Sequence, residues 1–458
     1  MQQHAATFIA QAEDAAGADL PQFVKDEFDA FLECGILAHG FLRLRCGVAF
    51  SCKRRGFCPS CGARRMAKTA AHLVDHVIPH VPVRQWVLSL PIPLRLLLAA
   101  QPKLLTPVLQ VVHRVITRFL LKQAGVKADE ADSGAVTLIQ RFGSAANLNI
   151  HLHCLVLDGV YRRGTDGAPA FVGVPAPTDA ALQTVLHKII TRMMKLLARR
   201  GVLVEEEGST CMADGDSDSD EARVLRPLQA AACTCRIAFG PRAGQKVLTV
   251  QGVMPKDADF KQTLCADSNG LSLHTAVRCG ADDRQALEQL CRYITRPALA
   301  NERVQTNAAG QVVLKLKTPW RDGTTHLVMS PLEFMQRRAA LVPRPRLHLI
   351  RFHGVLAPNA KLRALAVQQE VEAPAQAAPH ADCEANCAHH RPVRLSWAKL
   401  LKRVFELDLE HCPNCGGELK IIAAILEQPV IEKVLMHLGL QARAPPRAPA
   451  RGQALQAA

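Results

Sequence analysis

Aromatic residues and long apolar runs are both scarce in this sequence. Phe, Trp and Tyr make up 4% of the 458 residues, so broad platforms for stacking nucleobases are not expected. No stretch reaches the roughly 18 uninterrupted apolar residues of a membrane helix. The first twenty residues carry acids and lack the apolar segment of a secretory signal. Because 48% of the residues are hydrophobic, we expect a globular, cytoplasmic protein.

Basic residues are in clear excess. The chain has 56 Lys and Arg against 41 Asp and Glu, which gives a formal net charge of +15 at pH 7. A balance of this sign and size predicts a polyanionic partner, and nucleic acid is the obvious one.

Composition divides the chain into several regions. A cysteine-rich, basic segment comes first, and a long stretch follows in which apolar helical patterns alternate with short strands. An Ala/Pro/Gln-rich segment further on is typical of a linker. The predicted regions are a basic cysteine-rich module at 25–75, a main domain at 80–310, a basic extension at 311–363, the linker at 364–392, a small C-terminal module at 395–441 and a disordered tail at 442–458.

The sixteen cysteines indicate metal binding, because disulfides are rare in a reducing compartment. Cys58-Pro-Ser-Cys61-Gly has the spacing of a zinc knuckle, in which two thiolates turn toward one ion. Cys412-Pro-Asn-Cys415-Gly predicts a second knuckle, whose partners stay open. The candidates that could complete the first site are Cys34, His39, Cys46 and Cys52. Basic residues around this knuckle are expected to contact DNA phosphates; they are Lys53, Arg54, Arg55, Arg64 and Arg65.

A second candidate metal site lies in an expected β-hairpin. The β-rich segments 135–142 and 148–157 flank a turn-like Gly-Ser-Ala-Ala-Asn. Side chains alternate along a strand, so His151 and His153 point the same way and could share one divalent ion. Counting back across the hairpin puts Gln140 roughly opposite His151, where its amide oxygen could be a third ligand. By itself, a His-x-His pair does not separate a nuclease from a hydrolase.

The sequence contains only two tyrosines, so the search for a tyrosine nucleophile is short. One of them, Tyr293, lies in segment 282–296, which begins with acids and stops before a proline, as a helix should. Its apolar stripe predicts a buried face with Tyr293 on the flank, free to project toward a neighbouring site. A phenol with a pKa of about 10 needs activation or a polarised phosphate to react. His-held Mg²⁺ or Mn²⁺ could supply that polarisation.

Taken together, these motifs resemble the HUH-type rolling-circle transposases of the insertion sequence 91 family, in the single-tyrosine, common-region branch. The resemblance runs from about residue 34 to 440. It rests on Ser51–Gly62 (SCKRRGFCPSCG), Asn149–Cys154 (NIHLHC), Arg292–Arg303 (RYITRPALANER), Arg351–Lys361 (RFHGVLAPNAK) and Cys412–Gly417 (CPNCGG). One departure is that the relatives carry an extra cysteine-containing stretch where Gly47 alone joins Cys46 to Val48.

The resemblance implies an α+β fold with an HUH nuclease core, in which helices flank an antiparallel sheet, preceded by a zinc-binding module. It also implies an enzyme, associated with the nucleoid, that nicks and rejoins single-stranded DNA at element termini through a 5′-phosphotyrosine. His151 and His153 match the metal pair, with Mg²⁺ or Mn²⁺ as cofactor beside structural Zn²⁺, and Tyr293 matches the nucleophile. The alternatives are a plasmid replication initiator or relaxase, and a zinc-dependent DNA-binding protein that no longer cleaves.

Further basic residues are expected to contact DNA. The alternation in Val313-Leu-Lys-Leu-Lys-Thr-Pro-Trp puts Lys315 and Lys317 on one strand face, with Arg321 just beyond the turn. Trp320 could stack on a base or pack the turn. Phosphate contacts are expected to continue through Arg337, Arg338, Arg344, Arg346 and Arg351.

Overall fold

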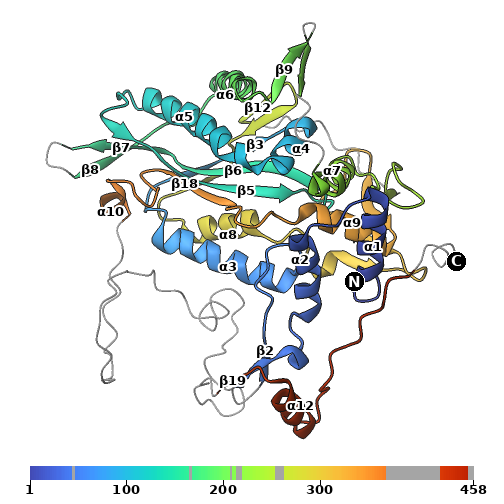
Figure 1. Cartoon of the computed structure of the whole chain (residues 1–458). Helices are drawn as coiled ribbons and strands as arrows, with labels where there is room; N and C mark the ends of the chain where they lie inside the picture. Colours follow the sequence, from blue (N-terminus) through green and yellow to red (C-terminus); the bar gives the residue numbers. More distant parts are fainter. Residues whose placement is uncertain are drawn as a thin grey trace, which may run out of the picture.

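Helices packed on antiparallel strands make up the protein in the computed structural model (Figure 1). The predicted α+β class is therefore confirmed. The structure describes residues 1–43, 47–164, 168–206, 209–212, 219–252, 263–367 and 423–451.

A seven-stranded antiparallel sheet forms the centre of the molecule. The predicted hairpin is there: β5 (Gly134–Phe142) pairs with β6 (Leu148–Leu157) on either side of a short turn. Along the main path the strands run in the order β12 (Cys265–Ser268), β13 (Leu271–His274), β3 (Val83–Ser89), β6, β5 and β18 (Ile350–Gly354), and β14 (Arg278–Cys279) also pairs with β3. The hairpin thus lies inside the sheet, where neighbouring strands fix its register.

The two faces of this sheet are buried in separate hydrophobic clusters, because neighbouring side chains on a strand point opposite ways. Leu152 and Cys154 of β6 belong to one cluster, and Leu155 and Leu157 belong to the other. The helices over the first face are α4 (Ile92–Ala100), α5 (Leu105–Gln123), α6 (Asp179–Arg199) and α7 (Asp220–Cys233), and those over the second are α3 (Pro59–His76) and α8 (Arg284–Thr295) (Figure 1). His151 and His153 share the parity of Leu155, so they belong to the face that α3 and α8 cover.

Among the described helices, one run is long and apolar enough to cross a membrane by length and composition alone. It is Pro102–Gln123, which joins η2 (Pro102–Leu104) to α5, and 56% of its apolar window is buried inside the protein. Its buried residues, such as Leu109 and Ile116, belong to the core cluster. The run therefore has the burial of a core helix, and Arg114 and Arg118 interrupt its apolar residues.

A C-terminal segment of the chain packs against the region of β1 (Phe41–Arg43) and β2 (Gly47–Ala49) (Figure 1). Strand β19 (Ala423–Ile425) pairs with β1, which also pairs with β2. Helix α12 (Gln428–His437) buries Ile431 and Leu435 against Phe41. The C-terminal segment thus adds a strand to the N-terminal region, a long-range pairing that sequence spacing does not reveal.

Within the segment predicted as a disordered tail, residues 442–451 are described and contact the N-terminal helices. Arg447 forms ion pairs with Asp29 (2.8 Å) and Glu33 (3.0 Å) of α2 (Gln22–Glu33). The backbone N–H of Arg451 donates to Thr7 on α1 (Ala5–Ala16), with 3.0 Å between the two atoms. Charge pairing and a hydrogen bond thus link this Pro/Ala/Arg stretch to two helices.

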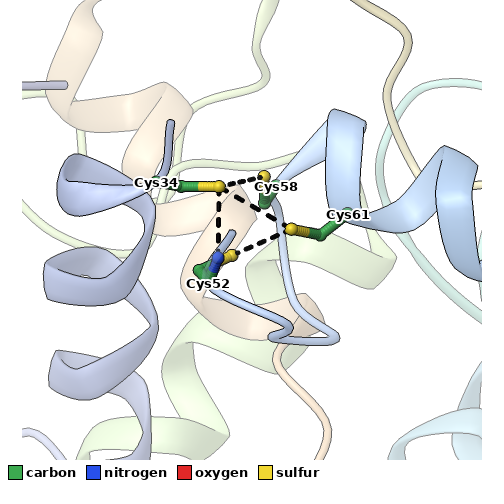
Figure 2. Close-up of side chains that lie close together, drawn as sticks. All are labelled: Cys34, Cys52, Cys58 and Cys61. Atoms are coloured by element: carbon green, nitrogen blue, oxygen red, sulfur yellow. Dashed lines mark hydrogen bonds between the residues drawn. The ribbon is translucent and has the colours of Figure 1, made fainter. Parts of the chain in front are cut away.

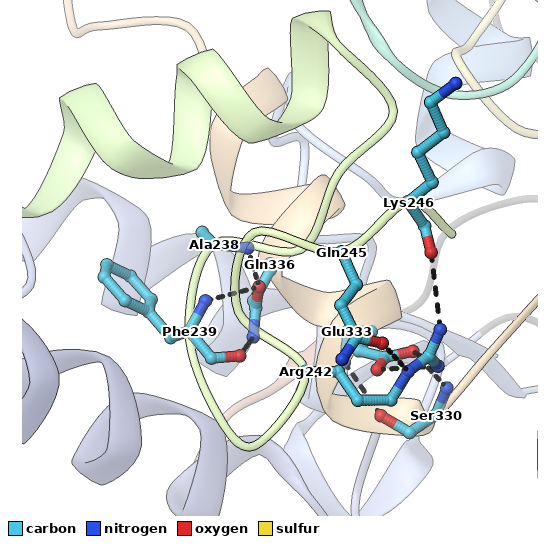
Figure 3. Close-up of polar contacts among 8 residues, drawn as sticks. All are labelled: Ala238, Phe239, Arg242, Gln245, Lys246, Ser330, Glu333 and Gln336. Atoms are coloured by element: carbon cyan, nitrogen blue, oxygen red, sulfur yellow. Dashed lines mark hydrogen bonds and ion pairs between the residues drawn. The ribbon is translucent and has the colours of Figure 1, made fainter. Parts of the chain in front are cut away.

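Helix α9 (Pro331–Leu341) is anchored by polar contacts at its beginning (Figure 3). Ser330 and Glu333 form a reciprocal capping box, and Arg242 pairs with Glu333 at 3.1 Å. Gln336 accepts from the backbone N–H of Ala238 and donates to the carbonyl of Phe239 (both 2.9 Å). These contacts fix the loop before β11 (Leu248–Gln251) to the helix.

Two arginines of α9 correct a prediction. Arg337 and Arg338 are buried, with 2% and 3% of their surfaces exposed, so they do not offer a surface to phosphates. Arg337 donates to the carbonyl of Ala145 in the β5–β6 turn, and Arg338 donates to that of Phe57 in the cysteine-rich loop. Arg344 is partly neutralised as well, since it pairs with Glu221 at 3.0 Å.

Smaller sheets and hairpins surround this core. The basic strand β16 (Val312–Lys315) lies between β15 (Val304–Thr306) and β17 (Thr324–Met329) in a four-stranded sheet that β11 completes. The remaining described elements are η1 (Leu37–His39), β4 (Ala131–Asp132), β7 (Gly159–Arg163), β8 (Pro169–Gly173), β9 (Leu203–Glu206), β10 (Ser209–Met212), η3 (Asn301–Arg303) and α10 (Arg363–Ala366).

Candidate active site

The two histidines of β6 lie side by side. Their ring centroids are 4.7 Å apart with 63° between the ring planes. The Nδ1 of His151 donates to the backbone carbonyl of Asn149 at 2.9 Å, which leaves its Nε2 with a free lone pair. The Nε2 of His153 is buried and has no hydrogen-bond partner among the described residues. An unsatisfied buried nitrogen beside a second available nitrogen fits a divalent ion.

Both imidazoles are held neutral, the form that binds metals. Burial lowers the pKa of His151, and the charge of Arg296 lowers it further, against the opposing effect of the hydrogen bond to Asn149. Burial, His151 and Arg296 together lower the pKa of His153 to about 3.

Two glutamines support the histidine pair. Gln140 lies directly opposite His151 in the β5–β6 register, as predicted, and its Nε2 donates to the carbonyl of Ile294 at 2.7 Å. Its oxygen remains the atom available to a metal. Gln85 of β3, which sequence reasoning missed, has its Nε2 2.8 Å from the Nδ1 of His153. A half-turn of this amide would let its oxygen accept from Nδ1–H instead, which frees Nε2 for a ligand role. Its only sequence signal was a polar residue within an apolar strand.

Tyr293 projects from α8 over the same face of the sheet. Asp283 caps the helix, while Leu287, Cys291 and Ile294 form its buried face as predicted. The tyrosine itself is 45% exposed. Ile294, the residue after Tyr293, accepts the hydrogen bond from Gln140 of β5, so this bond ties the tyrosine helix to the strand beside His151.

Two cations lie against the Tyr293 ring. The guanidinium carbon of Arg296 is 4.3 Å from the ring centroid, and the Nζ of Lys317 is 4.1 Å from it. Partial burial opposes ionisation of the phenol, but Arg296 and Lys317 outweigh it and bring the pKa of Tyr293 below its usual value. The other tyrosine, Tyr161, is 6% exposed and donates to the carbonyl of Ala366, so it is poorly placed to reach a substrate.

Four cysteines meet at the end of α2 and the beginning of α3 (Figure 2). They are Cys34, Cys52, Cys58 and Cys61, and all four sulfurs lie within 4.8 Å of one another. Individual sulfur pairs are 3.4–3.7 Å apart, close to the ~3.8 Å expected for four thiolates around zinc with Zn–S bonds of ~2.3 Å. The cluster is complete without Cys46, which lies outside the described residues, and without His39.

The thiols of this cluster are strongly coupled. Hydrogen bonds from Cys52 and Cys58 lower the pKa of Cys61, whereas hydrogen bonding to Cys58 and Cys61 raises the pKa of Cys52. Four adjacent thiols cannot all ionise unless a cation balances them, so the donor set fits structural Zn²⁺.

The cysteine cluster also lies against the tyrosine helix. Helices α3 and α8 pack on each other, and Thr295 donates to the carbonyl of Met66 at 3.5 Å. A side chain on Gly62 would meet Pro297 at 2.7 Å, so glycine permits this close approach. The zinc site thereby supports the position of α8.

The predicted DNA-contacting residues differ in what else they bind. Lys53, Arg54, Lys315, Lys317 and Arg321 are exposed. The predicted strand carries only Lys315, because β16 ends there and Lys317 lies in a bend just beyond it, with Leu314 and Leu316 buried. Two arginines instead stabilise the cysteine-rich loop. Arg55 donates to the carbonyl of Leu347, and Arg65 donates to the carbonyl of Lys53. Arg64 is half-buried. Trp320 packs partly against the core, which favours its turn-packing role.

The second predicted knuckle, at Cys412 and Cys415, lies outside the described residues.

Comparison with known proteins agrees with this architecture. The family model "Putative transposase" matches residues 134–363, about half of the chain, and the family model "Transposase zinc-binding domain", that of insertion sequence 91 elements, matches residues 1–90. Neither a curated protein nor a solved structure matches the chain.

The transposase model implies a DNA-processing enzyme, and the zinc-binding model together with the four-cysteine cluster supports a structural zinc module. The chain belongs to the insertion sequence 91 family of transposases.

Proposed function

We propose that this transposase nicks and rejoins single-stranded DNA through a 5′-phosphotyrosine formed on Tyr293, with an HUH-type core and rolling-circle transposition. The observation that carries the proposal is the hydrogen bond from Gln140 to the carbonyl of Ile294. Gln140 is also the register partner of His151. One buried hydrogen bond between sheet and helix therefore connects the strand beside the proposed metal ligands to the residue that follows the proposed nucleophile.

His151 and His153 would hold a divalent ion through their Nε2 atoms, with Gln140 as the nearest oxygen donor. Bound Mg²⁺ or Mn²⁺ supplies Lewis-acid polarisation of the scissile phosphate. Arg296 lies within electrostatic range of both histidines and of the Tyr293 ring. It can therefore stabilise negative charge on the phosphate and on the phenolate alike.

The bond changes are those of a transesterification. The Oη of Tyr293 loses its proton to water and attacks phosphorus, and the bond from phosphorus to the 3′-oxygen breaks. The departing 3′-oxygen takes up a proton and becomes a free 3′-hydroxyl. Because one phosphate ester replaces another, a second 3′-hydroxyl can reverse the step and rejoin a strand.

Lys317 and Arg296 would lower the barrier by favouring the phenolate, which is both the attacking and the departing group. The exposed side chains of Lys53, Arg54, Lys315 and Lys317 offer phosphate contacts. The zinc module would keep α3 against α8 and so hold Tyr293 over the histidines.

The test is covalent capture of DNA. Purified protein, a 5′-labelled and a 3′-labelled single-stranded oligonucleotide from an element end, and Mn²⁺ should give a denaturation-resistant adduct with the strand on the 3′ side of the nick. Tyr293→Phe should abolish the adduct, and the matched control Tyr161→Phe should retain it. An adduct that survives Tyr293→Phe, or one that forms equally in the presence of EDTA, would overturn the proposal.

A further inference from the structure

A cavity of about 350 Å³ lies on the sheet face opposite His151 and His153. Helix α5, the loop before β5 and the end of β18 surround it. This volume falls at the lower end of the ~300–1,000 Å³ typical of small-ligand sites. It therefore suits a single nucleotide and is far too small for a duplex.

Two stacked imidazoles form part of the cavity wall. His113 of α5 and His353 of β18 have ring centroids 3.6 Å apart and planes 22° from parallel. His113 is anchored by Thr137, 2.6 Å from its Nε2. The Nε2 of His353, in contrast, is buried and has no hydrogen-bond partner within the described residues. The cavity wall thus contains two flat imidazole rings and one nitrogen, His353 Nε2, that is free to form a hydrogen bond.

His353 belongs to the Arg351–Lys361 motif, which the active site leaves without a role. The next residue, Gly354, has a φ of +58°, and a side chain there would lie 1.8 Å from the carbonyl oxygen of Ser133. Only glycine allows β18 to end this close to the cavity loop. The position of β18 at the cavity wall therefore requires glycine at residue 354.

The mouth of the cavity is cationic. Arg114 and Arg118 line it from successive turns of α5, and both are exposed. Neither has an ion-pair partner in the part of the chain that the structure describes. Asp132 also lines the cavity, but its carboxylate is paired with Arg163 at 3.0 Å. The hydroxyls of Thr117 and Ser133, 2.7 Å apart, add small donors beneath the mouth.

We propose that this cavity binds one unpaired nucleotide of a DNA strand, with its phosphate on Arg114 and Arg118 and its base against the imidazole stack of His113 and His353. Arginines take phosphate, and flat rings take an unstacked base of a single strand. The base must be unpaired, because the cavity admits one ring system and no partner strand. This second DNA site goes beyond the transfer chemistry proposed above and does not depend on it.

The test measures strand binding on a Tyr293→Phe background, so that no covalent chemistry contributes. Fluorescence anisotropy with a labelled single-stranded 20-mer across a KCl series gives the affinity and its salt dependence. Arg114→Gln/Arg118→Gln should lower the slope of log K against log salt by about 0.7, since the one phosphate that both arginines contact contributes ~0.7 on a single strand.

The matched control is Lys195→Gln/Arg199→Gln, which removes the same charge at the same helical spacing from the exposed side of α6. It should leave the slope unchanged. Equal effects of the two variants would show that the arginines contribute only general electrostatic attraction, and would overturn the proposal that the cavity binds DNA.

Photocrosslinking locates the base independently. A 5-iododeoxyuridine oligonucleotide should crosslink to the tryptic peptide 352–361, and the product should disappear in Arg114→Gln/Arg118→Gln. Crosslinks confined to other peptides would contradict the proposal. Calorimetric binding of thymidine 5′-monophosphate that depends on these arginines, with unchanged affinity for the 20-mer, would instead assign the cavity to a free nucleotide.

Discussion

Replacing Lys317 by Met tests whether cations activate the proposed nucleophile. The Nζ of Lys317 lies 4.1 Å from the centroid of the Tyr293 ring, and Arg296 lies against the same ring. A cation at a partly exposed aromatic ring contributes about 1 kcal/mol. At a fixed pH below the phenol pKa, its loss should therefore slow adduct formation about fivefold.

The pH dependence of the rate of adduct formation shows whether Lys317 acts by lowering the pKa of Tyr293. The phenolate is the reactive form, and the two cations bring the pKa of Tyr293 below its usual value against the opposing effect of partial burial. Removing one cation raises that pKa. The rate should consequently still increase with pH, but its increase should move to higher pH, and wild-type and variant rates should converge in strongly alkaline buffer.

Single-turnover adduct formation from pH 6 to 10.5, with saturating oligonucleotide and Mn²⁺, measures this profile. Lys315→Met is the matched control, because it removes a second exposed lysine, at the end of β16 two residues before Lys317, that has no contact with the Tyr293 ring within the described residues. Identical profiles for the two variants, or a Lys317→Met defect that excess DNA restores, would refute the activating role and reduce Lys317 to a phosphate contact.

Four further outcomes are expected. His153→Ala should abolish the Mn²⁺-dependent adduct while the oligonucleotide affinity measured by anisotropy stays within about twofold, because phosphate contacts dominate that affinity; a normal adduct yield would exclude the metal role. Gln140→Ala should slow adduct formation by about 10–100-fold, the usual cost of losing a group that orients a metal site, and single-turnover rates measure it. Cys61→Ser should lower the zinc content by one equivalent in elemental analysis and lower the melting temperature, whereas unchanged zinc would move the site elsewhere. Arg338→Ala should destabilise the fold by about 3 kcal/mol in urea unfolding, as loss of a buried hydrogen-bonded charge and its packing does, whereas Arg321→Ala on the surface should change stability by less than about 0.5 kcal/mol and only weaken DNA binding.

Local patterns were sufficient for several features. Alternation along β6 identified the shared face of His151 and His153, and the turn residues identified the hairpin register that places Gln140 opposite His151. The helical stripe of α8 identified its buried face and left Tyr293 at the edge. These features depend on neighbours within about a dozen residues, and for that reason periodicity and turn chemistry reveal them.

Long-range packing decided what spacing could not. Gln85 reaches His153 only because β3 pairs with β6, and Lys317 reaches Tyr293 only because a separate sheet lies beside α8. Arg337 and Arg338 read as surface charges in the sequence, yet α9 buries them against two backbone carbonyls. A side chain's charge is visible in the sequence, but its solvation depends on which elements fold over it.

The sequence by itself determined the cysteine knuckle, the histidine pair, the tyrosine helix and the basic character that points to DNA. The tertiary structure alone decided that Cys34 and Cys52 complete the first cluster, that Tyr161 is enclosed, and that the C-terminal strand returns to the N-terminal region. The division has a physical reason: periodicity and spacing encode interactions between near neighbours, whereas these contacts join residues that only the packing of sheet and helices brings together.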